Sequence, residues 1–136
     1  MISKNSVNID PSSVKHTLAV IVPAYNEENT IARTIEGLKS IVPSQLPSSI
    51  MEFKVIVIND GSVDNTAQVA ESAGADIIVQ HGLNRGLGAA VRSGLIAARN
   101  HGATIAVKFD ADAQHDPRDI PALVSPILED NSDIVY

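Results

Sequence analysis

Two aspartates one residue apart, Asp110 and Asp112, follow an apolar stretch of the chain and precede Gln114. In an extended backbone, side chains two residues apart point the same way, so these three oxygen-bearing groups can face one side. Two carboxylates this close repel each other unless a proton or a cation intervenes. Because oxygen ligands favour Mg²⁺ or Mn²⁺ over zinc, we predict that the three residues hold such an ion. The same residues also fit an Asx turn and a helix cap before Pro117, which need no metal.

The overall charge suggests what such a metal ion would do. The formal net charge is −6, so an anionic ligand needs a local cation to bind. Mg²⁺ keeps few protein ligands and completes its coordination with water and phosphate oxygens. The motif therefore predicts a diphosphate held through the metal. The acidic balance also argues against a surface for nucleic acid, and no nucleic-acid partner is expected.

The segment PAYNEE, residues 23–28, is a second candidate for binding. It pairs the rigid Pro23 with Tyr25, whose ring can stack on a base or can simply fill core space. Asn26 is expected to cap the following helix, with Glu27 in the first turn, where the helix dipole favours acidic side chains. Local residues alone leave binding and helix initiation equally open.

Two further polar segments contain residues suited to a nucleotide. In NDGS, the Asp60 carboxylate can accept a hydrogen bond from a base or ribose, or can only shape the turn into the next helix. In GLNRGLGAAVRSG, Arg85 and Arg92 can neutralise phosphate, although a place on a solvated helix face is favoured for Arg92. The glycines of this segment match neither the dinucleotide fingerprint nor the P-loop pattern. Gly94 is therefore expected to allow a helix to pack closely on a sheet.

The elements that must position these segments follow from the alternation of apolar patterns. Strands are predicted at residues 18–22, 53–58, 76–80, 104–109 and 133–136, which are short, apolar and rich in β-branched residues. Helices are predicted between them, at about residues 27–42, 64–73, 87–100 and 118–129. This alternation is typical of an α/β fold with a doubly wound, mostly parallel sheet, helices on both faces, and a Rossmann-like topology. The carboxyl ends of the strands share one edge, so the four polar segments should gather there.

Length and composition set the domain organisation. We expect residues 1–16 to be a flexible polar lead and residues 17–136 to form one domain. No apolar run approaches the roughly 18 residues of a membrane span, and no signal-peptide pattern opens the chain, so a cytoplasmic location is expected. The chain stops on the strand at 133–136 with no helix to cover it. This ending predicts a fragment of a longer protein and a homodimer formed through the exposed strand.

Taken in order, the segments PAYNEE, NDGSVDNT, NRGLGAA and DADAQHDP resemble the inverting glycosyltransferases of family 2, which have the GT-A fold. The resemblance covers about residues 17–136 and is greatest to the polyprenyl-phosphate branch, the dolichyl-phosphate mannose or glucose synthase type. It implies a UDP- or GDP-hexose donor, a divalent metal, and an acceptor of the polyprenyl-phosphate kind. In the full-length protein it implies a place at the cytoplasmic face of a membrane.

The resemblance also implies residue roles. The donor nucleotide would be bound by five residues: Pro23, Tyr25, Glu27, Asp60 and Arg85. Among these, Asp60 would hold the base and Arg85 would neighbour a phosphate. Asp110, Asp112 and Gln114 would hold the metal and, through it, the diphosphate. The acceptor-binding half of the family, which usually supplies the general base, follows this last motif, so the 136 residues alone are expected to bind the donor without turnover.

Other function classes fit the residues less well. A sugar-phosphate nucleotidylyltransferase should have a glycine-rich basic loop after the first strand, where this chain has PAYNEENT. A receiver domain needs an aspartate at the end of the third strand and a lysine at the end of the fifth, near Gln80 and Tyr136 here. A non-catalytic nucleotide-binding module remains open.

Overall fold

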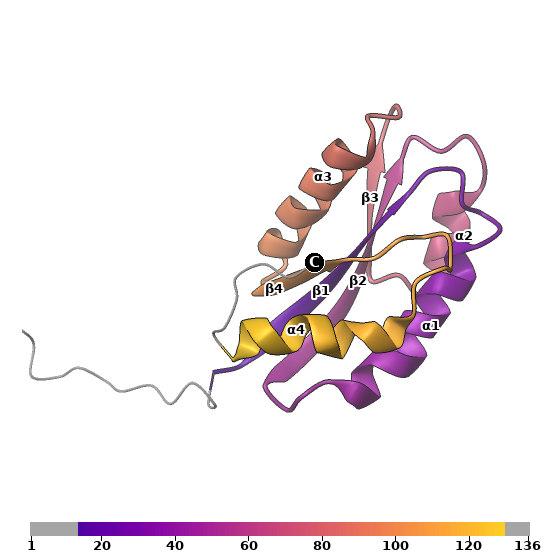
Figure 1. Cartoon of the computed structure of the whole chain (residues 1–136). Helices are drawn as coiled ribbons and strands as arrows, with labels where there is room; N and C mark the ends of the chain where they lie inside the picture. Colours follow the sequence, from indigo (N-terminus) through magenta and orange to yellow (C-terminus); the bar gives the residue numbers. More distant parts are fainter. Residues whose placement is uncertain (1–13, 130–136) are drawn as a thin grey trace, which may run out of the picture.

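The computed structural model describes residues 14–129. The predicted strand at 133–136, and with it the predicted homodimer contact, lies outside this range. The described chain forms a four-stranded sheet from β1 (His16–Ala24), β2 (Ile50–Asp60), β3 (Ile77–His81) and β4 (Ile105–Lys108). Every neighbouring pair is parallel, and the order across the sheet is β3-β2-β1-β4 (Figure 1). The predicted α/β class and the first four strands are confirmed.

Helices cover both faces of this sheet. The helices are α1 (Ile31–Gln45), α2 (Thr66–Ser72), α3 (Leu87–Asn100) and α4 (Ile120–Leu128), and a short 3-10 helix, η2 (Pro117–Asp119), leads into α4. One core cluster joins the sheet to α1, α2 and α4, and a second joins it to α3. Figure 1 shows the same division, with α3 on the opposite side of the strands from the other three helices. The sheet is therefore doubly wound.

The alternation of side chains along β1 explains how one strand serves both cores. Leu18, Val20 and Val22 point into the cluster with α1, while Ala19 and Ile21 point into the cluster with α3. On the first face, α1 contributes four fully buried residues at helical spacing: Ile31, Ile35, Leu38 and Val42. A strand with no polar face is expected only where helices cover both sides.

Gly94 lets α3 approach the other face closely. A Cβ atom at Gly94 would lie 2.3 Å from Cγ2 of Ile21 and 2.8 Å from Cδ1 of Ile58. The remaining core contacts of α3 are also small residues, Ala90, Ala97 and Ala98. The expected packing role of this glycine is confirmed, and it brings the start of α3 to the edge where β1 and β2 end.

The predicted start of the first helix is wrong. The first helix begins at Ile31, not after Asn26, and Asn26 has a left-handed backbone with φ of 52°. The side chain of Asn26 instead accepts a hydrogen bond from the Val63 amide at 3.0 Å. At α1 a hydrogen bond between two loops therefore outcompetes the helix cap. The second helix, predicted from about residue 64, begins at Thr66, and Oδ1 of Asp64 accepts from the Thr66 amide at 3.0 Å at its start.

The strand order defines where a ligand can bind. The chain builds β1, β2 and β3 outward in one direction and then places β4 on the other side of β1. The order therefore reverses between β1 and β4, and open parallel sheets bind ligands at the carboxyl ends beside this switch point. Among residues 14–129, no helix has the length and apolar character needed to cross a membrane.

Candidate functional site

A cavity of about 230 Å³ lies at this switch point, and we call it the switch-point cavity. Its lining comes from the ends of β1, β2 and β4 and the first turn of α3: Pro23, Ala24, Tyr25, Glu27, Asp60, Leu87, Ala90, Asp110, Ala111 and Asp112. Six of the eight residues selected from the sequence line it. The other two, Arg85 and Gln114, do not.

Asp60, the last residue of β2, is the most enclosed polar group of the cavity. It is 4% exposed, and its Oδ1 lies 2.7 Å from Nδ1 of His81. The backbone amide of Arg85 donates to the same oxygen, and that of Gly86 donates to Oδ2, each at 2.9 Å. Burial raises the pKa of Asp60, but these hydrogen bonds outweigh it and hold the pKa below the ordinary 3.8. The ionised carboxylate keeps acceptor capacity on Oδ2, which takes only one of these bonds.

Arg85 serves this site through its backbone. Its side chain is exposed and lies outside the cavity lining, whereas its amide anchors the loop after β3 to Asp60. The same loop crosses directly over Gly61, where a Cβ would lie 2.3 Å from the Asn84 nitrogen and where φ is 73°. Only glycine fits both conditions. The NDG and NRG segments therefore form one interlocked unit.

The loop after β1 exposes the ring of Tyr25, and the start of α1 that follows this loop contacts the segment that carries the paired aspartates. Tyr25 is 46% exposed, so its ring does not fill the core as one interpretation suggested. Two threonines at the start of α1 contact the carbonyl oxygen of Ala111, the residue between the aspartates. Oγ1 of Thr34 donates to it at 3.1 Å, and Oγ1 of Thr30 lies 2.9 Å from it. These contacts fix the position of residues 109–116, the loop between β4 and η2, relative to the loop that carries Tyr25. We call residues 109–116 the acidic loop.

Asp110 and Asp112 both line the switch-point cavity, but their surroundings differ. The carboxylate of Asp110 lies between two cationic or potentially cationic groups, with Lys108 Nζ 2.8 Å from Oδ1 and His115 Nε2 2.8 Å from Oδ2. The hydrogen bond from Lys108 is the main reason that the pKa of Asp110 lies below its ordinary value, and His115 adds to this. Oδ1 of Asp112 accepts from the Gln114 amide at 3.0 Å, which is an Asx turn.

The expectation that three oxygen groups face one side is wrong for the third residue. The strand ends at Lys108 and the chain turns from Ala111 onward, with Ala113 at φ of 61°. This turn sends the exposed Gln114 away from the aspartates and toward a different hollow. The expected helix cap before Pro117 is also present, since Oδ1 of Asp116 accepts from the Arg118 amide at 2.9 Å.

The donor set of the two aspartates still fits a hard divalent ion. Two carboxylates on one cavity wall, completed by water and diphosphate oxygens, match the way Mg²⁺ is bound in proteins. Within residues 14–129, no cluster of three or more His, Cys, Asp or Glu side chains offers a closed protein cage for a metal. A metal at Asp110 and Asp112 would therefore depend on the ligand for part of its coordination.

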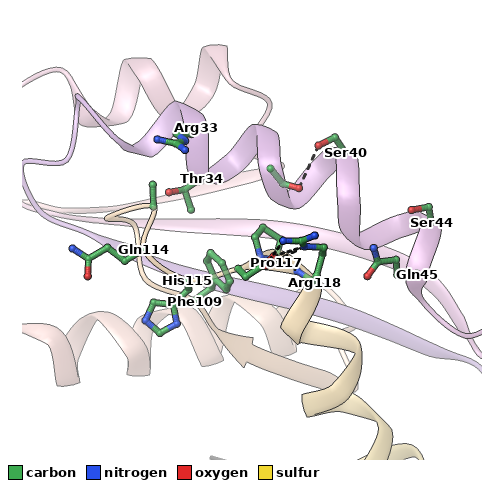
Figure 2. Close-up of a pocket in the computed structure, with 13 residues that line it drawn as sticks. Arg33, Thr34, Ser40, Ser44, Gln45, Phe109, Gln114, His115, Pro117 and Arg118 are labelled. Carbon is green, nitrogen blue, oxygen red and sulfur yellow. Dashed lines mark hydrogen bonds and ion pairs between the residues drawn. The ribbon is translucent and has the colours of Figure 1, made fainter.

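A larger hollow of about 680 Å³ lies on the other side of the acidic loop. Figure 2 shows it between α1, which presents Arg33, and the loop that carries Gln114 and His115. His115, the one histidine that the motif made interesting, stacks edge-on against Phe109 with ring centroids 5.7 Å apart. The acidic loop thus separates two hollows, with the aspartates facing one and residues 113–118 facing the other.

His81 is the site residue that the sequence did not reveal. It ends β3, is 7% exposed, and is paired with Asp60 in the register of the sheet. Its Nε2 lies 2.7 Å from Oγ of Ser93 on α3, so both ring nitrogens have partners. Only the register of β3 against β2, which pairs His81 with Asp60, reveals this contact.

Comparison with known proteins now settles the family. The model described as "Glycosyl transferase family 2" matches residues 19–136. The chain belongs to glycosyl transferase family 2. This confirms the resemblance carried by the four ordered motifs, and with it the GT-A type of α/β fold.

Two curated relatives from the family are lipid-phosphate sugar transferases by name. The chain is 33% identical to the UDP-N-acetylglucosamine–dolichyl-phosphate N-acetylglucosaminyltransferase of Methanococcus voltae, over 85% of this chain and 49% of the relative. It is 32% identical to the undecaprenyl-phosphate mannosyltransferase of Micrococcus luteus, over 79% of this chain and 42% of the relative. The chain therefore spans about half of the length of these family members.

A solved glycosyl-transferring enzyme shares the fold of this chain. It is glucosyl-3-phosphoglycerate synthase from Mycobacterium tuberculosis in complex with Mn²⁺, UDP and glucosyl-3-phosphoglycerate. It superposes with a TM-score of 0.65 at 29% identity, covering 83% of this chain and 40% of that chain. The same enzyme is known with Mg²⁺ and UDP, at a TM-score of 0.62.

Proposed function

We propose that this chain is the donor-binding part of an inverting hexosyltransferase that uses a UDP- or GDP-sugar with Mg²⁺ or Mn²⁺. The observation that carries the proposal is the composition of the switch-point cavity. A buried anionic acceptor, Asp60, and an exposed ring, Tyr25, share one cavity with the paired carboxylates of Asp110 and Asp112. These groups suit the two ends of a nucleoside diphosphate.

The base end favours bases that carry an N–H on their pairing edge. An ionised carboxylate accepts only from donors, and Asp60 is held ionised by its neighbours. Uracil and guanine present a ring N–H there, whereas adenine and cytosine present a bare ring nitrogen. We therefore expect UDP and GDP to bind better than ADP. Tyr25 supplies a ring face for stacking beside this contact.

The diphosphate end would use Asp110 and Asp112 as metal ligands. A divalent ion bound there would supply Lewis-acid stabilisation of the charge that develops on the leaving diphosphate. Lys108 and His115 keep the Asp110 carboxylate anionic and oriented until the ion arrives. Stabilisation that grows as the bond between the sugar and the diphosphate breaks lowers the activation barrier of the transfer. It does more than tighten the binding of the donor.

The acceptor that we propose is a polyprenyl phosphate. Support comes from the relatives of Methanococcus voltae and Micrococcus luteus, whose names give dolichyl and undecaprenyl phosphates as their substrates. A phosphate monoester is already an anionic nucleophile, so a strong general base matters less than for a sugar hydroxyl. Such an acceptor would place the full-length protein at the cytoplasmic face of a membrane.

Isothermal titration calorimetry tests the donor site. We expect UDP or GDP to bind with Mn²⁺ and to lose about tenfold or more in affinity when the metal is removed or in Asp112→Asn, which corresponds to about 1.4 kcal/mol. Asp119→Asn is the matched control, since it makes the same chemical change at an exposed residue at the N-cap position of α4, where the side chain makes no capping hydrogen bond. Equal affinities in all conditions would exclude the metal role. Absence of binding to both nucleotides would exclude the donor assignment.

A further inference from the structure

We infer that His81 is a positioning residue for base recognition, which holds the Asp60 carboxylate in one orientation while Ser93 on α3 fixes the ring of His81. The inference rests on the proposed function, because it concerns the group that would read the base. Three elements contribute one side chain each: β2, β3 and α3.

The geometry determines the proton on one ring nitrogen. Nδ1 of His81 lies 2.7 Å from Oδ1 of Asp60. Since a carboxylate can only accept, Nδ1 must carry a hydrogen. Nε2 lies 2.7 Å from Oγ of Ser93, which prevents the ring from flipping without loss of both contacts. His81 is also largely enclosed, at 7% exposure.

The contacts of His81 with Asp60 and Ser93 would restrict rotation of the Asp60 carboxylate. The terminal torsion of an aspartate has a broad energy profile, so an isolated carboxylate does not present one oxygen reliably. Here Oδ1 accepts from His81 and from the Arg85 amide, and Oδ2 accepts from the Gly86 amide. The remaining acceptor position on Oδ2 is then the one available to a ligand. Preorganisation of this kind raises affinity because less order has to be created on binding.

The same three residue types also occur in nucleophilic triads, but the placement of Ser93 excludes that chemistry. Ser93 lies in the middle of α3 (Leu87–Asn100), where backbone amides are bonded to carbonyl groups one turn earlier. No free pair of amides is then left beside its hydroxyl to stabilise an oxyanion. The arrangement therefore orients Asp60 instead of activating Ser93.

Two substitutions at His81 separate orientation from structure. His81→Asn keeps an N–H donor at the position of Nδ1, whereas His81→Leu keeps bulk and removes the donor. We expect His81→Leu with Mn²⁺ to lose about tenfold in affinity for the better of UDP and GDP, and His81→Asn to stay within about threefold of the wild type. Ser93→Ala should lie between them.

A base-free probe provides the control. Inorganic pyrophosphate with Mn²⁺ should bind all variants equally, because it does not reach Asp60. Loss of pyrophosphate affinity in His81→Leu parallel to the loss for the nucleotide would overturn the positioning role. So would an unchanged nucleotide affinity in His81→Leu, or equal losses in the asparagine and leucine variants. A wild type that binds pyrophosphate but neither nucleotide would overturn the proposed function together with this inference.

A measurement on the unsubstituted chain keeps the inference testable even where a variant does not fold. Long-range ¹H–¹⁵N NMR spectra should show a hydrogen on Nδ1 of His81 at pH 7, with and without the nucleotide. A bare Nδ1 would overturn the inference, and it would leave the proposed donor site standing.

Discussion

The aspartates at the strand ends of this protein differ in what holds them ionised. Asp60 is buried and depends on a histidine and two backbone amides, while Asp110 is partly exposed and depends on Lys108 and His115. The first arrangement is rigid, because backbone amides are held by the fold and cannot move away from the carboxylate as a side chain can. The second is made of side chains, which can move aside for a metal ion. This difference suits the two proposed roles. Asp60 would be a fixed group that contacts the base, and Asp110 would be a metal ligand whose present partners can be replaced by the ion.

The buried arrangement predicts an acid dependence of stability. The folded-state pKa of Asp60 lies below 3.8, so its stabilising contribution is fully present above that value and is lost as the pH falls through the lower folded value. Asp60→Asn should lower the free energy of unfolding by roughly 1–3 kcal/mol at pH 7, because its amide leaves buried donors unsatisfied. Urea unfolding at pH 7, 5 and 3 should show this difference narrowing toward the lowest pH. A constant difference, or an equal effect in exposed Asp119→Asn, would contradict the explanation.

At the residue level, the sequence predicted groups that act locally and missed groups that act through neighbours. Asp60, Asp110 and Asp112 follow directly from their place after apolar strands, and all line the cavity. His81 was missed because its role depends on the register between β2 and β3. Gln114 was misplaced because the chain turns from Ala111 and passes through the left-handed Ala113, whereas the spacing argument assumed an extended backbone.

At the level of elements, α3 is the helix whose packing most directly sets the site. It carries Ser93, and its first turn contributes Leu87 and Ala90 to the cavity. Its approach to the sheet is possible only because Gly94 has no side chain. The middle of α3 therefore lies directly against Ile21 of β1 and Ile58 of β2 at this glycine.

This contact predicts unequal effects of two glycine substitutions in the same helix. Gly94→Ala should lower the free energy of unfolding by about 1–3 kcal/mol, since its methyl group would overlap Ile21 and Ile58. Gly88→Ala is the matched control, because a Cβ there meets no atom within 4 Å. It should be neutral or stabilising by up to about 1 kcal/mol through helix propensity. Chemical denaturation of both variants would check this, and equal effects would contradict the close packing of α3.

The elements themselves were predictable because apolar pattern and length determine them, whereas the start of α1 was not. The four strands and the buried stripe of α1 follow from uninterrupted apolar runs and helical spacing. The start of α1 depends on which partner binds the polar side chain of Asn26. Asn26 bonds to the loop after β2, which lies 37 residues away in sequence. Such competition is decided by tertiary structure and leaves no local pattern.

At the scale of the whole molecule, both cores share one sheet. Residues of β1 and β2 belong to the cluster with α1 and also to the cluster with α3, so neither side of the sheet can unfold alone without exposing the other. We therefore expect one cooperative transition for the described part of the chain. The switch-point cavity is lined by Ala24 and Ala111 of the first core cluster and by Ala90 of the second. A ligand bound there should therefore stabilise both cores.

Ligand binding should consequently raise the melting temperature of the entire transition, and only when metal and nucleotide are present together. The preferred nucleotide at 100 times its Kd contributes about 2.7 kcal/mol, which for a chain of this size corresponds to roughly 10 °C. Because the chain carries a formal net charge of −6, the anionic nucleotide with a chelator should give a much smaller shift. Differential scanning calorimetry of the wild type and Asp112→Asn, each with nucleotide, Mn²⁺, or both, measures this. Two separate transitions of which one shifts would contradict the shared core, and an equal shift without metal would contradict a metal bridge between the acidic loop and the diphosphate.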